Sequence, residues 1–176
     1  SSAHAIRRNA AILPAYSLAL WFSAHTFPWQ PVQPPRGVVR HITPSDNIDM
    51  LRHIGQDRNM LFTTRIDAVY GLVNLMETAS RRTAALQGDV AFLYGAKDQI
   101  IPHASAIAAA RRLPAHARTA VYANGYHMLI RDNERELVYA DILSFIEAPN
   151  APFPSGAPPL IPAHEPAPTA TAQANR

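Results

Sequence analysis

The chain has 176 residues, of which 48% are hydrophobic and 16% charged, which is enough to form one domain with a hydrophobic core. The formal net charge is only +3 and the basic residues are scattered in pairs, which argues against a nucleic-acid-binding protein. The absence of cysteine excludes disulfides, a thiolate nucleophile and a cysteine-based zinc site, and it leaves the cellular compartment open.

The first structured segment is predicted at residues 10–30, which carry no charge and are rich in leucine, phenylalanine and tryptophan. Arg7-Arg8 before this apolar run also fits a signal peptide, but neither an initiator methionine nor a small-x-small cleavage site accompanies it. A transmembrane helix needs about 20 apolar residues, and Pro14 and Pro28 interrupt this stretch. The pattern favours an amphipathic helix whose apolar side packs in a core or lies at a surface.

Two further helices are predicted after a proline-rich connector at residues 31–40. Thr43 is the expected N-cap of the first, with Pro44 at the first helical position and Gly55 at its end. Its expected buried residues are Ile48, Leu51 and Ile54. The second helix spans residues 65–81 and carries an apolar stripe made of Ile66, Val69, Val73 and Met76.

A strand, a helix and a second strand are predicted next. Residues 90–94 form an apolar run that ends at Gly95, and residues 119–123 form another that ends at Asn124-Gly125. Residues 103–113 lie between them and show a helical pattern with arginines in the last turn, where cations suit the helix dipole. A right-handed crossover makes the two strands parallel neighbours, so the loops that follow them leave the sheet at the same edge.

Those two loops carry the candidate catalytic residues, Asp98 and His127. An aspartate beside one imidazole nitrogen fixes the tautomer and stabilises the imidazolium, so the other nitrogen can take a proton from a nucleophile. Taken alone, His127 could be an ordinary surface-loop histidine. The Asp98 loop on the adjacent strand, and Gly125, which permits a tight turn, favour two members of a hydrolytic triad.

The last helix is predicted from Asp132, its expected N-cap, to Ala148. Its apolar face consists of Leu137, Val138, Ile142, Phe145 and Ile146. From Pro149 onward the composition shifts to proline and alanine with few large apolar side chains, so we expect residues 149–176 to be disordered. The other histidines do not lie at metal-ligand spacing, and we expect no metal and no cofactor.

The sequences YGAKDQIIP at 94–102 and GYHML at 125–129 resemble the last two strand–loop units of the α/β-hydrolase fold. The similarity is greatest to the monoacylglycerol lipase and lysophospholipase-like branch. The triad of this family follows the order serine, acid, histidine. By this resemblance Asp98 corresponds to the acid and His127 to the base of a serine hydrolase that cleaves carboxylic esters of lipids.

The resemblance and the composition imply an α/β protein with three parts. By resemblance, residues 1–86 correspond to a helical cap and residues 87–148 to the last two parallel strands of the core with their helices. Residues 149–176, which the resemblance does not cover, form the third part, the tail expected to be disordered from its composition. In the family the cap covers the active site and presents an apolar surface to acyl chains, so residues 10–30 would form a lid that can touch a lipid or membrane surface. We therefore expect a small ester or lipid as substrate, and the cytoplasm or the membrane periphery as location.

The chain departs from the family at the nucleophile. No serine lies between two glycines at the G-x-S-x-G spacing, the oxyanion-hole loop is missing, and the sequence opens at Ser1 without methionine. We expect the C-terminal half of a serine hydrolase that is inactive alone. Two alternatives stay open: a hydrolase with an aspartate nucleophile, which shares the same acid and base, and a non-catalytic remnant or interaction module whose open sheet edge a partner covers.

Overall fold

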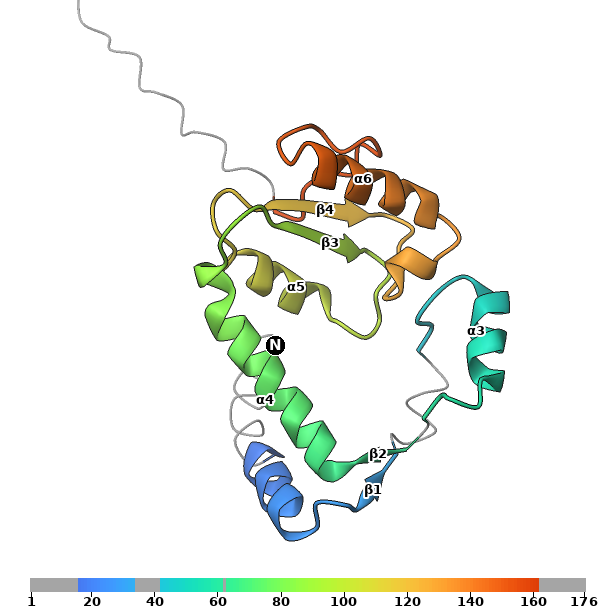
Figure 1. Cartoon of the computed structure of the whole chain (residues 1–176), viewed down its shortest axis with the longest axis vertical. Helices are drawn as coiled ribbons and strands as arrows, with labels where there is room; N and C mark the ends of the chain where they lie inside the picture. Colours follow the sequence, from blue (N-terminus) through green and yellow to red (C-terminus); the bar gives the residue numbers. More distant parts are fainter. Residues whose placement is uncertain (1–15, 34–41, 62, 162–176) are drawn as a thin grey trace, which may run out of the picture. The chain divides into compact units, whose positions relative to one another are not determined.

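A computed structural model describes residues 16–33, 42–61 and 63–161 of the chain (Figure 1). The chain divides into two compact units. The first, here the helical unit, contains Ser1–Thr43 and Asn47–Leu86, and the second, the sheet unit, contains Pro44–Asp46 and Gln87–Arg176. The sheet unit therefore takes three residues from within the sequence of the helical unit.

The helical unit begins with helical residues 16–26, followed by the antiparallel pair of β1 (Pro31–Val32) and β2 (Thr64–Arg65). Its other elements are α3 (Ile48–Gln56), α4 (Ile66–Arg82) and the 3-10 turn η1 (Thr83–Ala85). Helices are thus present in each of the three predicted segments, although residues 10–15 lie outside the described residues and residues 27–30 are not helical. No helix among the described residues combines the length and the apolar character that a membrane span requires.

The start of α3 differs from the prediction. Its N-cap is Asn47, whose side-chain oxygen accepts a hydrogen bond from the Met50 N–H at 3.1 Å, so Thr43 as N-cap and Pro44 as first helical residue are wrong. The physical reason is tertiary. Residues 44–46 belong to the sheet unit and form hydrogen bonds with Asp132 and Asn133 of that unit instead of starting the helix.

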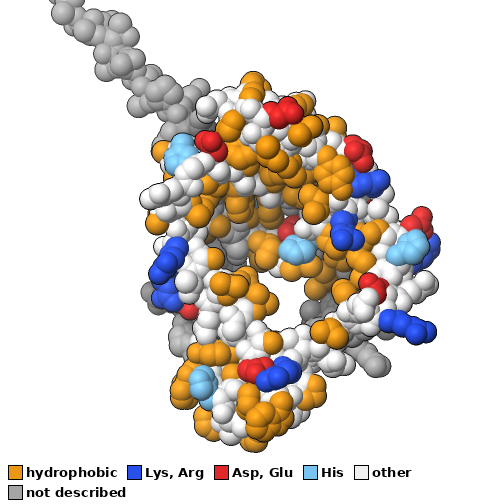
Figure 2. Space-filling view, in the orientation of Figure 1, with side chains coloured by type: hydrophobic (Ala, Val, Ile, Leu, Met, Phe, Trp, Pro, Cys, Tyr) orange, Lys and Arg blue, Asp and Glu red, His pale blue; other side chains and the backbone are white. Residues whose placement is uncertain are grey.

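The apolar sides of the helices are less covered than the pattern predicted. Neither α3 nor α4 contains a buried residue, and Val73 and Met76 of the predicted stripe are 42% and 53% exposed. In the first helix Phe22 is also exposed, and Trp29, which follows it, is 71% exposed. Figure 2 shows such hydrophobic side chains over the surface of the helical unit. Within the described residues, large apolar side chains of this unit are therefore open to solvent.

The sheet unit contains the predicted crossover. β3 (Ala91–Gly95) and β4 (Arg118–Tyr122) are parallel and pair in register from Ala91 opposite Arg118 to Gly95 opposite Tyr122. α5 (His103–Ala110) connects them, and η2 (Leu129–Arg131) and α6 (Arg135–Glu147) follow. In Figure 1, α5 and α6 lie on opposite sides of the strand pair.

Alternation along the two strands produces a small core on each side of the pair. Tyr94 packs with Ala106 and Ala110 of α5, whereas Ala120 and Tyr122 pack with Val138 of α6. The alanines allow the α5 backbone to approach the strands closely. The two loops that carry Asp98 and His127 therefore leave a strand pair that is packed on both faces.

Residues 149–161 pack on the outer side of β4, where we expected disorder. The Val121 N–H donates to the Pro158 carbonyl at 2.8 Å, and the Leu160 N–H donates to the Thr119 hydroxyl at 2.9 Å. Leu160 is buried and Phe153 contacts the α6-side core, so a few apolar anchors hold a proline-rich segment that cannot form regular structure. The rest of the expected tail, residues 162–176, lies outside the described residues.

Asp141 of α6 anchors this segment from within the core. Its carboxylate is fully buried and accepts hydrogen bonds from the Tyr122 hydroxyl at 2.7 Å, the Ser155 N–H at 2.8 Å and the Ser155 hydroxyl. Burial and the contact with Asp141 raise the pKa of Tyr122 far above its ordinary value. Arg118 adds hydrogen bonds to the Pro149 and Ala151 carbonyls.

Candidate acid–base site

The two loops after β3 and β4 are joined by backbone hydrogen bonds at the carboxyl ends of the strands. The Ala96 N–H donates to the Tyr122 carbonyl at 2.9 Å, and the Lys97 N–H donates to the Gly125 carbonyl at 2.9 Å. The Lys97 ammonium also donates to the Asn124 side-chain oxygen at 2.9 Å. These contacts fix the two loops to each other independently of the side chains of Asp98 and His127.

Asp98 and His127, 29 positions apart in the sequence, meet at this edge as the crossover predicted. Asp98 Oδ2 lies 3.0 Å from Nδ1 of His127. Asp98 Oδ1 accepts the N–H groups of Ile100 and Ile101 at 2.7 and 2.9 Å, an Asx-type turn that holds the carboxylate. The role of the two residues in catalysis stays a prediction.

Burial and hydrogen bonding act in opposite directions on the Asp98 carboxyl. Burial alone would raise its pKa, but the Ile101 N–H, the His127 ring and the Ile100 N–H all stabilise the anion and together hold the pKa of Asp98 below its ordinary value. Asp98 is therefore ionised at neutral pH and can act only as an acceptor.

An acceptor at this position determines which nitrogen of His127 carries the hydrogen. Because ionised Asp98 cannot donate, Nδ1 of His127 is the donor, and in the neutral ring Nε2 is then the basic nitrogen. The His127 side chain is 38% exposed whereas that of Asp98 is 5% exposed. The imidazole of His127 is therefore open to solvent, whereas the carboxylate of Asp98 is shielded from it.

Gly95 makes the close approach of the two loops possible. A Cβ at this position would lie 2.5 Å from the carbonyl carbon and oxygen of Gly125 and still closer to the carbonyl oxygen of Tyr126. These are backbone atoms, which cannot move aside as a flexible side chain can.

We therefore expect Gly95→Ala to lower the free energy of unfolding by about 3 kcal/mol, because a methyl group is forced into a filled site. Urea unfolding followed by circular dichroism measures this. Gly71→Ala is the control: its Cβ has open space within α4, and alanine in a helix interior should stabilise by roughly 0.5–1 kcal/mol. An unchanged urea midpoint for Gly95→Ala would contradict the close approach.

Asp132, predicted as the N-cap of the last helix, has a different position. α6 begins at Arg135, and its N-cap residue Glu134 makes no side-chain capping hydrogen bond. Asp132 is 2% exposed and lies beside residues 124–128, here called the histidine loop. It bonds with Ser45 and with the backbone of Tyr126. A helical pattern that starts shortly after an aspartate could not reveal this, since Ser45 is distant in the sequence.

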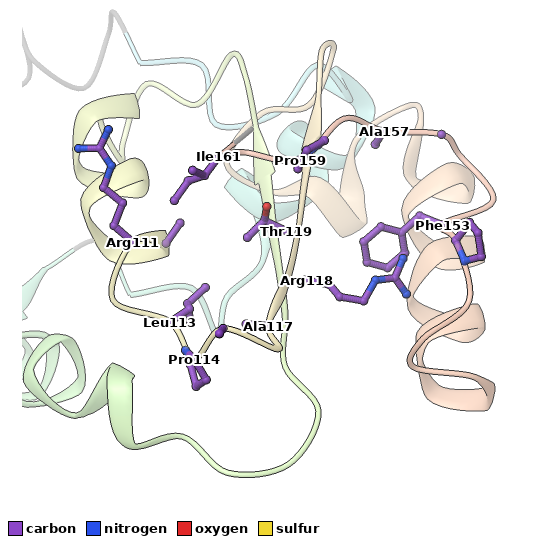
Figure 3. A pocket seen from close by; sticks show the side chains of 14 residues that line it. Arg111, Leu113, Pro114, Ala117, Arg118, Thr119, Phe153, Ala157, Pro159 and Ile161 are labelled. Carbon is purple, nitrogen blue, oxygen red and sulfur yellow. The ribbon is translucent and has the colours of Figure 1, made fainter. Parts of the chain in front are cut away.

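The other features that could hold a ligand lie elsewhere. Within the described residues no group of three His, Cys, Asp or Glu residues could hold a metal ion. The sheet unit has a cavity of about 750 Å³ lined by residues that include Leu113, Thr119, Phe153 and Ile161 (Figure 3). Thr119 is the second residue of β4, so this cavity is at the opposite end of the strand from the loops of Asp98 and His127.

Comparisons with known proteins show similarities in sequence and in fold. Residues 1–134 match the family model described as serine aminopeptidase, S33. The crystal structure of the monoacylglycerol lipase of Paleococcus ferrophilus is similar to the chain with a TM-score of 0.63 at 16% sequence identity. The match covers 74% of this chain and 51% of the lipase, so the chain spans about half the length of that protein. No curated protein sequence matches the chain significantly.

Proposed function

Because the chain belongs to the serine aminopeptidase S33 family of α/β-hydrolases, we propose that it supplies the acid and the base of a serine hydrolase that cleaves carboxylic esters of the monoacylglycerol or lysophospholipid type. The observation that carries the proposal is the 3.0 Å contact between Asp98 Oδ2 and His127 Nδ1, at the ends of two adjacent parallel strands. This is the arrangement in which a carboxylate orients a general base.

The proposed chemistry is acyl transfer in two steps. A serine hydroxyl attacks the ester carbonyl while Nε2 of His127 takes the serine proton, and Asp98 holds the imidazolium that forms. The tetrahedral intermediate then collapses, the bond between the carbonyl carbon and the alcohol oxygen breaks, and the leaving alcohol takes the proton from Nε2. Water attacks the acyl-enzyme by the same route and frees the acid. Backbone N–H groups of an oxyanion hole stabilise the charge on the carbonyl oxygen.

The exposed apolar surface of the helical unit supports a lipid substrate. Trp21, Phe22 and Phe27 are 45%, 59% and 57% exposed, and they lie in the segment that we expected to form a lid over acyl chains. Aromatic and aliphatic side chains of this kind suit contact with acyl chains or with a lipid surface.

The serine itself is expected from a part of the protein outside this sequence. No G-x-S-x-G motif is present, and the chain spans about half of the lipase to which it is similar. The proposal therefore predicts that the coding sequence upstream of Ser1 encodes a strand, a G-x-S-x-G turn and a helix. G-x-D-x-G at that place would favour the hydrolases with an aspartate nucleophile instead.

Labelling with a fluorophosphonate probe tests this division of the triad. The 176-residue chain should remain unlabelled, whereas the chain extended to include the upstream serine half should react with the probe at one site per molecule, because only the extended form contains an activated serine. Heat-denatured extended protein is the control for nonspecific reaction. Stoichiometric labelling of the 176-residue chain would refute the view that its nucleophile is absent.

The second candidate is a non-catalytic interaction module. Within the described residues, β3 pairs with β4 alone, and residues 149–161 cover the outer side of β4 but not the other edge of β3. An open strand edge binds another strand readily, so a partner would cover it. Extended protein that hydrolyses no ester and does not react with the probe would favour this candidate.

A further inference from the structure

The loop that carries His127 is held from behind by a buried pair, Ser45 and Asp132, to which the proposed chemistry gives no role. The two side chains are 0% and 2% exposed, and the Ser45 hydroxyl donates to Asp132 Oδ1 at 2.6 Å. The second carboxylate oxygen, Oδ2, accepts the N–H of Tyr126 at 2.7 Å. One buried carboxylate thus joins residue 45 to the residue just before His127.

The residue after His127 is held by the same short segment. The Met128 N–H donates to the carbonyl of Pro44 at 3.0 Å. Asp46 accepts the Asn133 N–H at 2.8 Å, and its own carbonyl accepts the Asn133 side-chain amide at 3.1 Å. The backbone N–H groups on both sides of His127 are therefore bound to residues 44–46 or to the carboxylate that Ser45 contacts.

We propose that Ser45 and Asp132 are positioning residues for His127, which fix the peptide on either side of the imidazole so that its ring stays in contact with Asp98. The role rests on the proposed function, since a positioned imidazole matters for acid–base chemistry. The set formed by the Pro44 carbonyl, Ser45 and Asp132 is here called the histidine clamp.

The histidine clamp would fix the orientation of the His127 ring, which is partly exposed to solvent. Within the described residues the His127 ring is held by its contact with Asp98, and its side chain is 38% exposed. The direction of Nε2 is therefore set by the backbone of residues 126–128. Misplacing a catalytic group by about 1 Å can reduce a rate about 100-fold. Hydrogen bonds that fix the backbone beside His127 would therefore help to keep the proposed reaction fast.

The hydrogen bonds of Asp132 explain how the pair of Ser45 and Asp132 can be buried. A carboxylate that is removed from water costs free energy unless its hydrogen bonds are satisfied, and Asp132 has a hydroxyl and an N–H as donors. Residues 44–46 belong to the sheet unit although the chain on both sides of them belongs to the helical unit. Because α3 starts after its N-cap Asn47, Ser45 is not part of the helix and can contact Asp132 beside the histidine loop.

Nitrogen-15 NMR of the histidine rings in the full chain tests the clamp directly. The wild-type protein should show a protected Nδ1–H of His127. In Ser45→Ala and Asp132→Ala that proton should exchange with water about ten-fold faster, because the loop opens more often. Asp132→Asn should keep slow exchange, since its amide oxygen accepts from Tyr126 and its NH₂ donates to the Ser45 hydroxyl.

Two control variants separate positioning from stability. Asp141→Ala removes an equally buried carboxylate on the α6 side and should lower the melting temperature while leaving the His127 Nδ1–H protected. Ser105→Ala changes an exposed serine of α5 and should change neither quantity. If Asp132→Ala does not fold, the milder Ser45→Ala still decides.

Unchanged exchange of the His127 Nδ1–H in Ser45→Ala would overturn the proposal. Equally fast exchange in Asp141→Ala, well below its melting temperature, would overturn it too, because the effect would then come from lost stability alone. The experiment needs neither a substrate nor the nucleophilic serine of the proposed triad. Its failure is therefore distinct from the failure of the ester-hydrolase proposal, which the fluorophosphonate labelling reveals.

Discussion

Asp98→Asn should reduce kcat about 10³- to 10⁴-fold in the form of the protein that carries the serine half, with the fold intact. The asparagine NH₂ can face Nδ1 of His127 only if that nitrogen accepts, which moves the ring hydrogen to Nε2. An Nε2 that already carries a hydrogen cannot take the proton of the serine. Hydrolysis of a p-nitrophenyl ester measures kcat, and the melting temperature shows whether the fold is kept.

Asp89→Asn is the matched control, because Asp89 is an exposed aspartate at the start of the same unit and should leave kcat unchanged. In the wild-type protein, the contribution of the Asp98 carboxylate to stability has a defined pH dependence. The pKa of Asp98 is lowered in the folded protein, so its contribution is present above the ordinary value of about 4 and is lost as the pH falls through the lowered value. Wild-type kcat in Asp98→Asn would show that Asp98 is not the triad acid.

Asp141→Ala should lower the free energy of unfolding by about 2–5 kcal/mol, the second large effect that the structure predicts. The alanine would leave the buried hydroxyl of Tyr122 and the N–H of Ser155 without their acceptor, and it would detach residues 149–161 from α6. Urea unfolding of the 176-residue chain measures the change.

The controls for this prediction divide the interaction. Tyr122→Phe removes one hydrogen bond and should cost about 1 kcal/mol, whereas Asp89→Ala at the surface should stay within about 0.5 kcal/mol of wild type. A loss below about 1 kcal/mol in Asp141→Ala would mean that residues 149–161 are not held by this carboxylate.

The parts of the fold that follow local rules could be predicted from the sequence. Residues 90–94 and 119–123 show strand patterns with a helical segment between them, and the rules for parallel strands then place the loops of Asp98 and His127 side by side. That contact needs no knowledge of packing beyond the strand pair. The prediction therefore agrees with the structure for the strand–helix–strand unit, because residues close together in the sequence determine its elements.

The features that the sequence did not predict depend on contacts between distant residues. Thr43 and Asp132 both resemble N-caps locally, but residues 44–46 bond to the histidine loop and Asp132 accepts from Ser45 instead. Residues 149–161 look disordered by composition, because their anchoring partners are on β4 and α6. Tertiary hydrogen bonds changed each of these assignments.

The carbon-13 titration of the Asp98 carboxyl is the most direct test of the acid–base pair. In the wild-type chain the pKa of Asp98 should lie below its ordinary value, and His127→Gln should raise it, because the ring is one of the groups that stabilise the carboxylate. His116→Gln, which changes a histidine bonded to the Gly88 carbonyl, should have no effect on it. An Asp98 titration that is the same in wild type and His127→Gln would contradict the pairing on which the proposed function depends.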